Sequence, residues 1–209
     1  TGTRTPGSEL LPFLQAVPEH VWVVLDEAYL EYVEDDDHIN GATLLSRFPN
    51  LIVTRTFSKV YGLAAVRFGY GVSSPAFADL LNRARQPFNV NSLAMAASLA
   101  ALEDDDYVNE SVALNRAGMA QMTEGLTRLG YDFIPSAGNF VAFDSAEPGN
   151  DLFQRMLREG VIVRAIAEYG LPNHVRVSIG LESENERFLS VLAKVGSHAR
   201  PKSTHQAES

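Results

Sequence analysis

The sequence predicts an α/β fold, in which a larger lobe with a mainly parallel sheet and helices is followed by a smaller α+β lobe. Three observations support this prediction. Residues 21–29 (VWVVLDEAY) form a Val-rich apolar run, which is typical of a strand buried on both faces, as in parallel sheets under helices. Short β-rich runs then alternate with longer helical patterns as far as Gly130. After Gly130 the rhythm shifts to short strands, which indicates the second lobe.

The first lobe opens with apolar residues at helical spacing in 8–17 (SELLPFLQAV), which predict the end of a helix. Two short strands are expected on either side of a glycine-containing loop, at 50–57 (NLIVTRTF) and 66–73 (VRFGYGVS). Three helical patterns follow, at 74–86, 91–104 and 105–130. Gly130 ends the last of these as a helix C-cap would.

The second lobe is expected to contain three strands, at 139–145 (NFVAFDS), 161–166 (VIVRAI) and 174–180 (HVRVSIG). Two amphipathic helices are expected between and after them, at 150–160 and 182–196. We place the boundary within or near the long helix between Asp104 and Gly130, and assign the domains 1–105 and 106–197. The polar tail 198–209 is predicted to be disordered because it has few apolar residues.

The composition excludes several classes of function. A net charge of -9 without a basic stripe argues against nucleic acid or an anionic membrane surface as a partner. No apolar run approaches the ~20 residues that span a bilayer. The chain has no cysteine, which fits the reducing cytoplasm and excludes thiolate zinc sites. The five histidines lack metal-ligand spacing, and the acidic runs at 34–38 and 103–106 lack the glycine of a calcium loop, so we expect no metal.

Asp26 ends the first apolar strand, where open α/β sheets present functional groups. A carboxylate there can accept a hydrogen bond from a cationic ligand nitrogen. Alternatively, Asp26 or Glu27 caps the turn that follows. The same pattern also matches the magnesium-holding strand of a P-loop ATPase, although no Gly-rich phosphate loop is present in these residues.

Lys59 lies among small and hydroxylated residues, close to Thr56 and Ser58, with Arg67 eight positions later. A lysine taken partly out of water loses its charge more easily, and the neutral amine is the nucleophile that forms Schiff bases. The planar Arg67 guanidinium suits a phosphate. Taken alone, a lysine is more often a solvated surface group.

Taken together, Asp26, Tyr29, Ser58–Lys59 and Arg67 resemble the cofactor site of the fold-type I aminotransferases, which use pyridoxal 5'-phosphate. The opening TGT is similar to the end of a turn in that family, and we expect the chain to be the later part of a longer protein. Within the family, residues 55–71 and 81–104 look most like histidinol-phosphate aminotransferases. The resemblance runs from Thr1 to about Gly196.

The resemblance implies a role for each matching residue. Lys59 would form the Schiff base with the cofactor and later move the proton, and Asp26 would keep the pyridine nitrogen protonated. Tyr29 would hydrogen-bond the ring oxygen of the cofactor. Ser58 and Arg67 would bind the phosphate, assisted by Thr56. The first residues 1–105 would then be part of the large cofactor-binding domain of this family.

Arg164 and Arg176 lie in or beside apolar strands, where a charge needs a partner. Internal salt bridges are one explanation. The resemblance implies another, in which Arg176 clamps the acidic group of the substrate and Arg164 helps to bind a phosphate; two arginines suit a dianion. Asn89 and Asn139 would line the substrate pocket, although asparagines in such turns usually bond the backbone.

The implied activity is transamination of histidinol phosphate with glutamate or 2-oxoglutarate in histidine biosynthesis, in a homodimer. The family's upstream half contributes further cofactor contacts and a tyrosine from the second subunit, so we expect the chain alone to be weakly active or inactive. Alternatively, the protein uses the same cofactor for a different reaction, as an aromatic aminotransferase or a phosphothreonine decarboxylase does. A non-catalytic aminotransferase-like binding domain, as in some regulators, is a further alternative, and an ATPase would belong to a different class.

Overall fold

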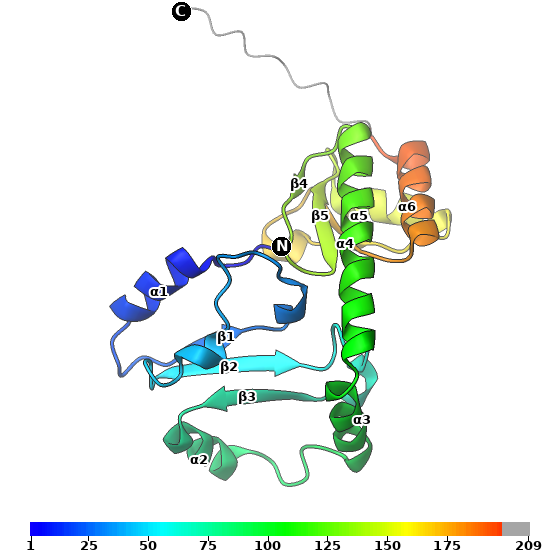
Figure 1. Cartoon of the computed structure of the whole chain (residues 1–209). Helices are drawn as coiled ribbons and strands as arrows, with labels where there is room; N and C mark the ends of the chain where they lie inside the picture. Colours follow the sequence, from blue (N-terminus) through cyan, green and yellow to red (C-terminus); the bar gives the residue numbers. More distant parts are fainter. Residues whose placement is uncertain (198–209) are drawn as a thin grey trace, which may run out of the picture. The chain divides into compact units, whose positions relative to one another are not determined.

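The computed structural model describes residues 1–197, which form two compact units. The first unit is Arg4–Val112, and the second contains Thr1–Thr3 and the described residues from Ala113 onward. The division lies inside the long helix α4, Asp105–Arg128, which Figure 1 labels. The grouping of Thr1–Thr3 with the second unit was not predicted. The tail 198–209, which was expected to be disordered, lies outside the described residues.

The first unit is built on a three-stranded sheet in the order β1-β2-β3 (Figure 1). Its strands are β1 (Val23–Asp26), β2 (Leu51–Thr56) and β3 (Gly69–Ser73). β1 and β2 are parallel, whereas β2 and β3 are antiparallel. The sheet is therefore mixed, and only one of its two pairings has the direction expected of a mainly parallel sheet. This arrangement still brings the carboxyl ends of β1 and β2 to the same edge.

The expectation that the first strand is buried on both faces is wrong for β1. Its residues alternate between half-buried and exposed, and Val24 is 60% exposed. The inward-facing residues Val23 and Leu25 pack on a small core of five buried residues, which are Leu10, Leu14, Phe48, Leu51 and Val53. An apolar run therefore predicted the strand correctly, but it could not predict what covers each face.

Helices complete the first unit. α1 runs from Gly7 to Ala16 as a whole helix rather than the end of one, and Leu10 and Leu14 lie one turn apart on its buried face. α2 (Pro75–Ala84) starts with proline at its first position, as expected. α3 (Ser92–Leu102) is capped by Asn91, whose Oδ1 accepts the Ala94 backbone N–H at 2.8 Å. Short 3₁₀ turns cover Leu30–Tyr32, Gly41–Leu44 and Ala64–Val66.

The second unit has a four-stranded antiparallel sheet in the order β4-β5-β7-β6. Its elements are β4 (Phe133–Ile134), β5 (Phe140–Asp144), β6 (Arg164–Ala165), β7 (His174–Ser178), a 3₁₀ turn (Ala167–Tyr169) and the helices α5 (Gly149–Arg158) and α6 (Glu182–Val195). The strand predicted at 161–166 pairs over only two residues, and Ile162 is 78% exposed. The lobe is therefore α+β, as predicted.

Helices and sheet enclose one large apolar core in the second unit. Its fully buried members come from α4, β5, α5, β7 and α6, and include Met122, Phe143, Leu152, Val175 and Leu192. The C-cap prediction at Gly130 is confirmed, because this residue has φ +82 and the Tyr131 N–H donates to the Leu126 carbonyl at 2.9 Å. Across residues 1–197, none of the helices combines the length and apolarity needed to cross a membrane.

Candidate active site

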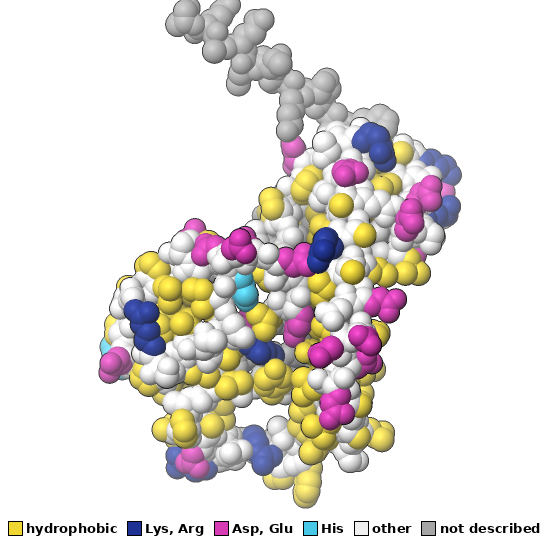
Figure 2. Space-filling model, in the orientation of Figure 1, with side chains coloured by type: hydrophobic (Ala, Val, Ile, Leu, Met, Phe, Trp, Pro, Cys, Tyr) yellow, Lys and Arg dark blue, Asp and Glu magenta, His cyan; other side chains and the backbone are white. Residues whose placement is uncertain are grey.

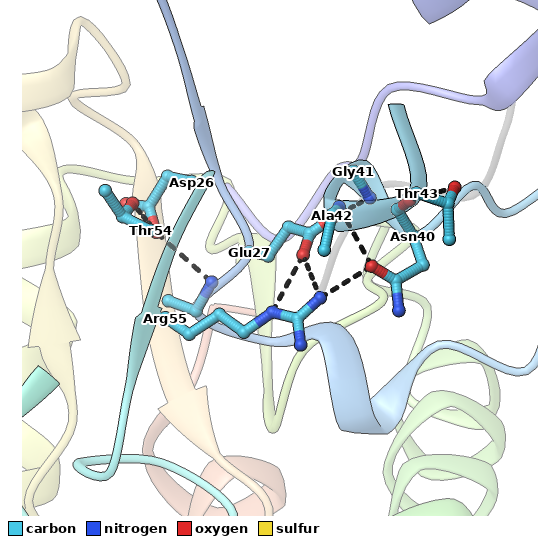
Figure 3. A network of polar contacts seen from close by, with 9 residues as sticks. Asp26, Glu27, Asn40, Gly41, Ala42, Thr43, Thr54 and Arg55 are labelled. Carbon is cyan, nitrogen blue, oxygen red and sulfur yellow. Dashed lines mark hydrogen bonds and ion pairs between the residues drawn. The ribbon is translucent and has the colours of Figure 1, made fainter. Parts of the chain in front are cut away.

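Asp26 is placed at the carboxyl end of β1, directly opposite Thr54 in β2. Its Oδ1 accepts the Ala28 backbone N–H at 3.1 Å and the Thr54 hydroxyl at 3.4 Å (Figure 3). Within residues 1–197 both bonds go to Oδ1, and the side chain is exposed, so Oδ2 is available to a ligand. Asp26 therefore caps the turn and can also accept a hydrogen bond from a cationic nitrogen.

Glu27 points the other way and has a different role. It is buried, and its Oε2 accepts two hydrogen bonds from Arg55, at 3.0 Å from Nε and 2.8 Å from Nη2 (Figure 3). Its Oε1 accepts the Gly41 N–H at 2.6 Å, and Arg55 also donates to Asn40 at 2.7 Å. Burial would lower the pKa of Arg55, but Glu27 and Tyr70 outweigh it and raise that pKa.

This network bears on the ATPase alternative. Both carboxylate oxygens of Glu27 are committed to protein donors, so it is not available to hold magnesium. In the part of the chain that the structure describes, no group of three acidic, histidine or cysteine side chains could hold a metal ion. The two adjacent acidic residues therefore have different roles. Asp26 is exposed at the edge of the sheet, whereas Glu27 is buried and connects the end of β1 to Arg55 in β2.

Lys59 is half-buried in the loop that follows β2. Its ammonium lies 5.0 Å from the centre of the Tyr29 ring, so the turn after β1 and the loop after β2 are brought together. The loop is held from below by Phe57, which is 1% exposed and stacks on Phe68 with ring centres 5.3 Å apart. The Leu63 N–H also donates to the Phe57 carbonyl at 2.9 Å. The loop that contains Lys59 is therefore stabilised by aromatic packing and by a backbone hydrogen bond.

Ser58 and Arg67 are brought together in a way that suits an anion. The Arg67 guanidinium donates to the Ser58 hydroxyl at 3.5 Å and to the Ala64 carbonyl at 3.0 Å. Arg67 has φ 55, an uncommon backbone conformation for a residue other than glycine, and such outliers concentrate at functional sites. The Thr56 hydroxyl accepts the Ser58 N–H at 3.1 Å and so supports the loop. The hydroxyl and guanidinium form a donor set for phosphate.

Two neighbours of these residues were missed from sequence alone, Glu31 and Tyr61. Burial raises the pKa of Glu31. Burial, together with the charge of Glu31, raises the pKa of Tyr61 to about 12, so its hydroxyl stays protonated and hydrogen-bonds Glu31. Tyr61 also packs on Phe57 with ring centres 5.0 Å apart. The signal that could have found them is their position, two residues beyond Tyr29 and Lys59.

Arg164 and Arg176 face each other across β6 and β7 in the second unit. The Arg176 guanidinium lies 4.7 Å from the centre of the Phe140 ring, and within residues 1–197 no carboxylate is within ion-pair distance of it. Arg164 Nη2 donates to Glu168 Oε1 at 2.9 Å and to the Tyr169 hydroxyl at 3.0 Å. The salt-bridge explanation therefore holds for Arg164 and fails for Arg176.

These arginines line a hollow of about 660 Å³, together with Ser178 and Ser183. Like charges placed opposite each other in an antiparallel pair destabilise a sheet, so a paired site of this kind suits an anionic ligand. The hydrogen bond from Glu168 raises the pKa of Arg164. The pKa of Glu168 is lowered by its own backbone N–H, by Arg164 and, to a smaller extent, by the charge of Arg176.

The predicted asparagines are placed differently. Asn89 is exposed in the first unit, and its Oδ1 accepts a hydrogen bond from Arg85 at 3.1 Å. Asn139 is half-buried in the second unit, and its backbone carbonyl accepts the Ile179 N–H at 2.9 Å. Neither is part of the contacts described above, so their role in a substrate pocket stays a prediction.

Comparison with protein families gives one match that covers nearly the whole chain. The family described as aminotransferase class I and II matches residues 1–192. Among curated proteins, "Histidinol-phosphate aminotransferase 2" of Pseudomonas fluorescens is 60% identical over 195 residues, which are 93% of this chain and 53% of the relative. "Histidinol-phosphate aminotransferase 1" of Nitrosococcus oceani is 56% identical over the same shares. The chain thus spans about half the length of the curated relatives it matches.

Solved structures agree on the fold. The histidinol-phosphate aminotransferase of Sinorhizobium meliloti, in complex with pyridoxal-5'-phosphate, matches with a TM-score of 0.85 and 32% identity. The match covers 93% of this chain and 54% of that one. The L-threonine-O-3-phosphate decarboxylase of Porphyromonas gingivalis has a TM-score of 0.80 at 22% identity, over 92% of this chain and 60% of that one, and shows the fold alone. The predicted α/β transferase fold is confirmed.

Proposed function

Because this chain belongs to the class I and II aminotransferases, we propose that it carries the cofactor lysine and the substrate-binding arginines of a pyridoxal-phosphate-dependent histidinol-phosphate aminotransferase. One observation carries the proposal. The ends of the neighbouring strands β1 and β2 carry the Asp26 carboxylate, Lys59 beside the Tyr29 ring, and the hydrogen-bonded pair of Ser58 and Arg67. The chain that carries them is 60% identical to such an enzyme.

The residues present fit this cofactor. Pyridoxal phosphate, when bound, supplies an electron-accepting ring and an aldehyde that joins to amines. Asp26 Oδ2 would accept a hydrogen bond from the ring nitrogen and keep it protonated. Ser58 and Arg67 would hold the phosphate through the hydroxyl and guanidinium that already lie together. Tyr29 would orient the ring oxygen through its hydroxyl.

Lys59 would act in its neutral form, as the group that joins the aldehyde and then takes and returns a proton at Nζ. The Tyr29 ring fixes the direction of the side chain. The Phe57 contacts hold the loop in one conformation, which keeps Nζ aimed at a single point.

The arginine pair of the second unit would bind the anionic groups of the substrates. Histidinol phosphate carries a dianionic phosphate, and glutamate carries carboxylates in the other half-reaction. Arg176 forms no ion pair within residues 1–197, so it can bind either anion without breaking one. We propose that the amino group passes between glutamate and the keto partner of histidinol phosphate, a step of histidine biosynthesis.

We further propose that the intact protein works as a homodimer in the cytoplasm. The absence of cysteine fits a reducing compartment. Large exposed apolar side chains in the first unit, such as Leu93 at 78% and Leu99 at 63%, fit a surface that is buried by further protein. Sedimentation of the full-length protein measures the oligomeric state, and a monomer would contradict this part of the proposal.

The decisive test is covalent attachment of the cofactor. Pyridoxal phosphate is added to the protein, borohydride is added to reduce the adduct, and mass spectrometry locates the phosphopyridoxyl group. We expect it on Lys59, at about one per chain, and we expect Lys59→Ala to lose it. Lys194→Ala is the matched control. Lys194 is an exposed lysine of α6 that forms an ion pair with Glu159, and its substitution should not affect labelling.

The measurement is made both on this chain and on a longer protein that contains it. If neither protein is labelled, the proposed cofactor is contradicted. Where labelling succeeds, initial rates with histidinol phosphate, phenylalanine and O-phosphothreonine separate the proposed aminotransferase from an aromatic aminotransferase and from a decarboxylase, which would release carbon dioxide. Attachment without turnover of any amine would favour the non-catalytic binding domain.

A further inference from the structure

Of the two arginines, only Arg164 forms an ion pair with a carboxylate within residues 1–197, and that carboxylate is Glu168. Glu168 lies in the 3₁₀ turn Ala167–Tyr169, which directly follows β6, and the four-residue spacing returns its side chain to Arg164. Its Oε1 accepts a hydrogen bond from Arg164 Nη2 at 2.9 Å. Arg176, opposite Arg164, has no such partner within residues 1–197. The two guanidinium groups are therefore unequally occupied.

Arg164 is anchored independently of Glu168. The Tyr169 hydroxyl accepts a hydrogen bond from the same Nη2 at 3.0 Å, and the guanidinium lies 5.4 Å from the centre of the Tyr169 ring. Loss of the Glu168 contact would leave these two interactions in place. The ion pair itself is open to solvent, because the side chains of Arg164 and Glu168 are 48% and 55% exposed. A dissolved anion can therefore replace the Glu168 carboxylate while Arg164 stays in position.

The location of this ion pair matters because Arg164 lines the 660 Å³ hollow beside Arg176. A ligand phosphate that contacts both arginines must compete with Glu168 for Arg164. Glu168 acts on Arg176 only through the weaker interaction of their charges, without a hydrogen bond. The charge on Glu168 therefore opposes a phosphate on Arg164 more strongly than a carboxylate on Arg176.

We propose that Glu168 is a resident counter-ion that competes with phosphate for Arg164, and so sets how tightly the site binds phosphate relative to carboxylate. The identification of that phosphate with the substrate's phosphate rests on the proposed function. Glu168 is a positioning residue rather than a catalytic residue, because it acts through Arg164. In the absence of phosphate it neutralises half of a like-charged pair, and during binding it is displaced into solvent.

The test uses the arginine side-chain NMR signals of the ¹⁵N-labelled protein, titrated with inorganic phosphate and, separately, with acetate. Glu168→Gln keeps a hydrogen-bond acceptor for Arg164 and removes the charge. We expect it to tighten phosphate binding about two- to fivefold, which corresponds to the strength of an exposed ion pair. Acetate binding, followed at Arg176, should change less, because Glu168 acts on Arg176 only through the weaker interaction of their charges. Glu168→Asp should bind phosphate as the unmodified protein does.

Asp79→Asn is the matched control for net charge. Asp79 forms an exposed ion pair with Arg83 at the same four-residue spacing, in α2 of the first unit. This substitution changes the protein's charge by the same amount, so phosphate binding should stay constant. If Asp79→Asn tightened phosphate binding as much as Glu168→Gln, the effect would come from overall charge and the inference would be overturned.

Other outcomes separate the inference from the proposed function. Arg164→Ala should weaken phosphate binding. If it does so while Glu168→Gln has no effect, the inference fails and the anion site stands. If neither Arg164→Ala nor Arg176→Ala weakens phosphate binding, the arginine pair is not an anion site and both proposals fail. In turnover, Glu168→Gln should lower KM for histidinol phosphate about two- to fivefold and change KM for glutamate less; equal shifts in both would overturn the inference.

Discussion

The two units of this chain are stabilised in different ways. The second unit has a continuous apolar core, in which Met122, Phe143 and Leu192 are fully buried. The first unit has a core of five buried residues and adds a buried ion pair between Glu27 and Arg55. It also exposes more large apolar side chains than the second unit does, and Figure 2 shows hydrophobic side chains on its surface over α1, α2 and α3.

The difference follows from what each unit must position. An apolar core is non-directional and fills volume, whereas hydrogen bonds to a buried carboxylate fix atoms at set distances and angles. In the first unit Glu27 directly follows Asp26, and Arg55 directly precedes Thr56, so their ion pair links the two strand ends that carry the proposed chemistry. In the second unit the arginines stand on strands that the apolar core already holds in register.

The largest effect is expected from the apolar core. Phe143→Ala should reduce the free energy of unfolding by about 3–5 kcal/mol, because it removes a fully buried ring and leaves a cavity. Urea unfolding followed by circular dichroism measures the loss. Phe88→Ala is the control, because Phe88 is 98% exposed in the first unit and its removal should cost less than about 0.5 kcal/mol. Similar losses for both would break the comparison.

A somewhat smaller effect is expected from the buried ion pair. Glu27→Gln should cost about 3 kcal/mol, because it leaves the Arg55 charge half-buried without its counter-ion. The double variant Glu27→Leu with Arg55→Met should recover much of that loss, since no charge is left unpaired. Asp79→Asn, which breaks an exposed pair, should have no measurable effect on unfolding. If Glu27→Gln left the free energy of unfolding unchanged, the network would not stabilise the first unit.

Close backbone packing in the first sheet gives a third prediction. A Cβ on Gly69 would lie 2.7 Å from the Arg55 carbonyl oxygen, so Gly69→Ala must move β3 away from the end of β2. We expect a loss of about 1–3 kcal/mol and weaker labelling of Lys59. Gly71→Ala is the control on the same strand, because its nearest neighbour, the Val53 carbonyl oxygen, would be at an ordinary 3.7 Å. Equal effects at the two positions would contradict this packing argument.

The smallest effect is a pH dependence centred on Glu31. Burial raises its pKa above 4.5 in the folded protein, so the folded state binds the proton more tightly than the unfolded state does. The stability contributed by Glu31 is complete below pH 4.5 and is lost as the pH rises through the folded-state pKa. Glu31→Gln avoids that loss, so its advantage over the unmodified protein should grow between pH 4 and pH 7. Urea unfolding at several pH values tests this, and a constant difference would contradict it.

Short stretches of sequence determined several features by themselves. The apolar run that ends at Asp26 specified a strand and the residue at its carboxyl end, and Gly130 specified the end of α4 through its positive φ. Lys59, Ser58 and Arg67 formed part of the family resemblance that indicated the cofactor. These features depend on backbone preferences and residue types within a few positions, which one chain segment contains in full.

Tertiary structure alone decided the rest. Asp26 and Glu27 are adjacent and chemically alike, yet only the packing of Arg55 and Gly41 determines which is buried and which is presented to a ligand. The antiparallel direction of β3, the exposed face of β1 and the shortness of β6 likewise depend on what lies beside each strand. The pairing of Arg164 with Arg176 joins segments separated by a turn. Such choices are made by contacts between segments distant in sequence, and no local pattern contains both partners of a contact.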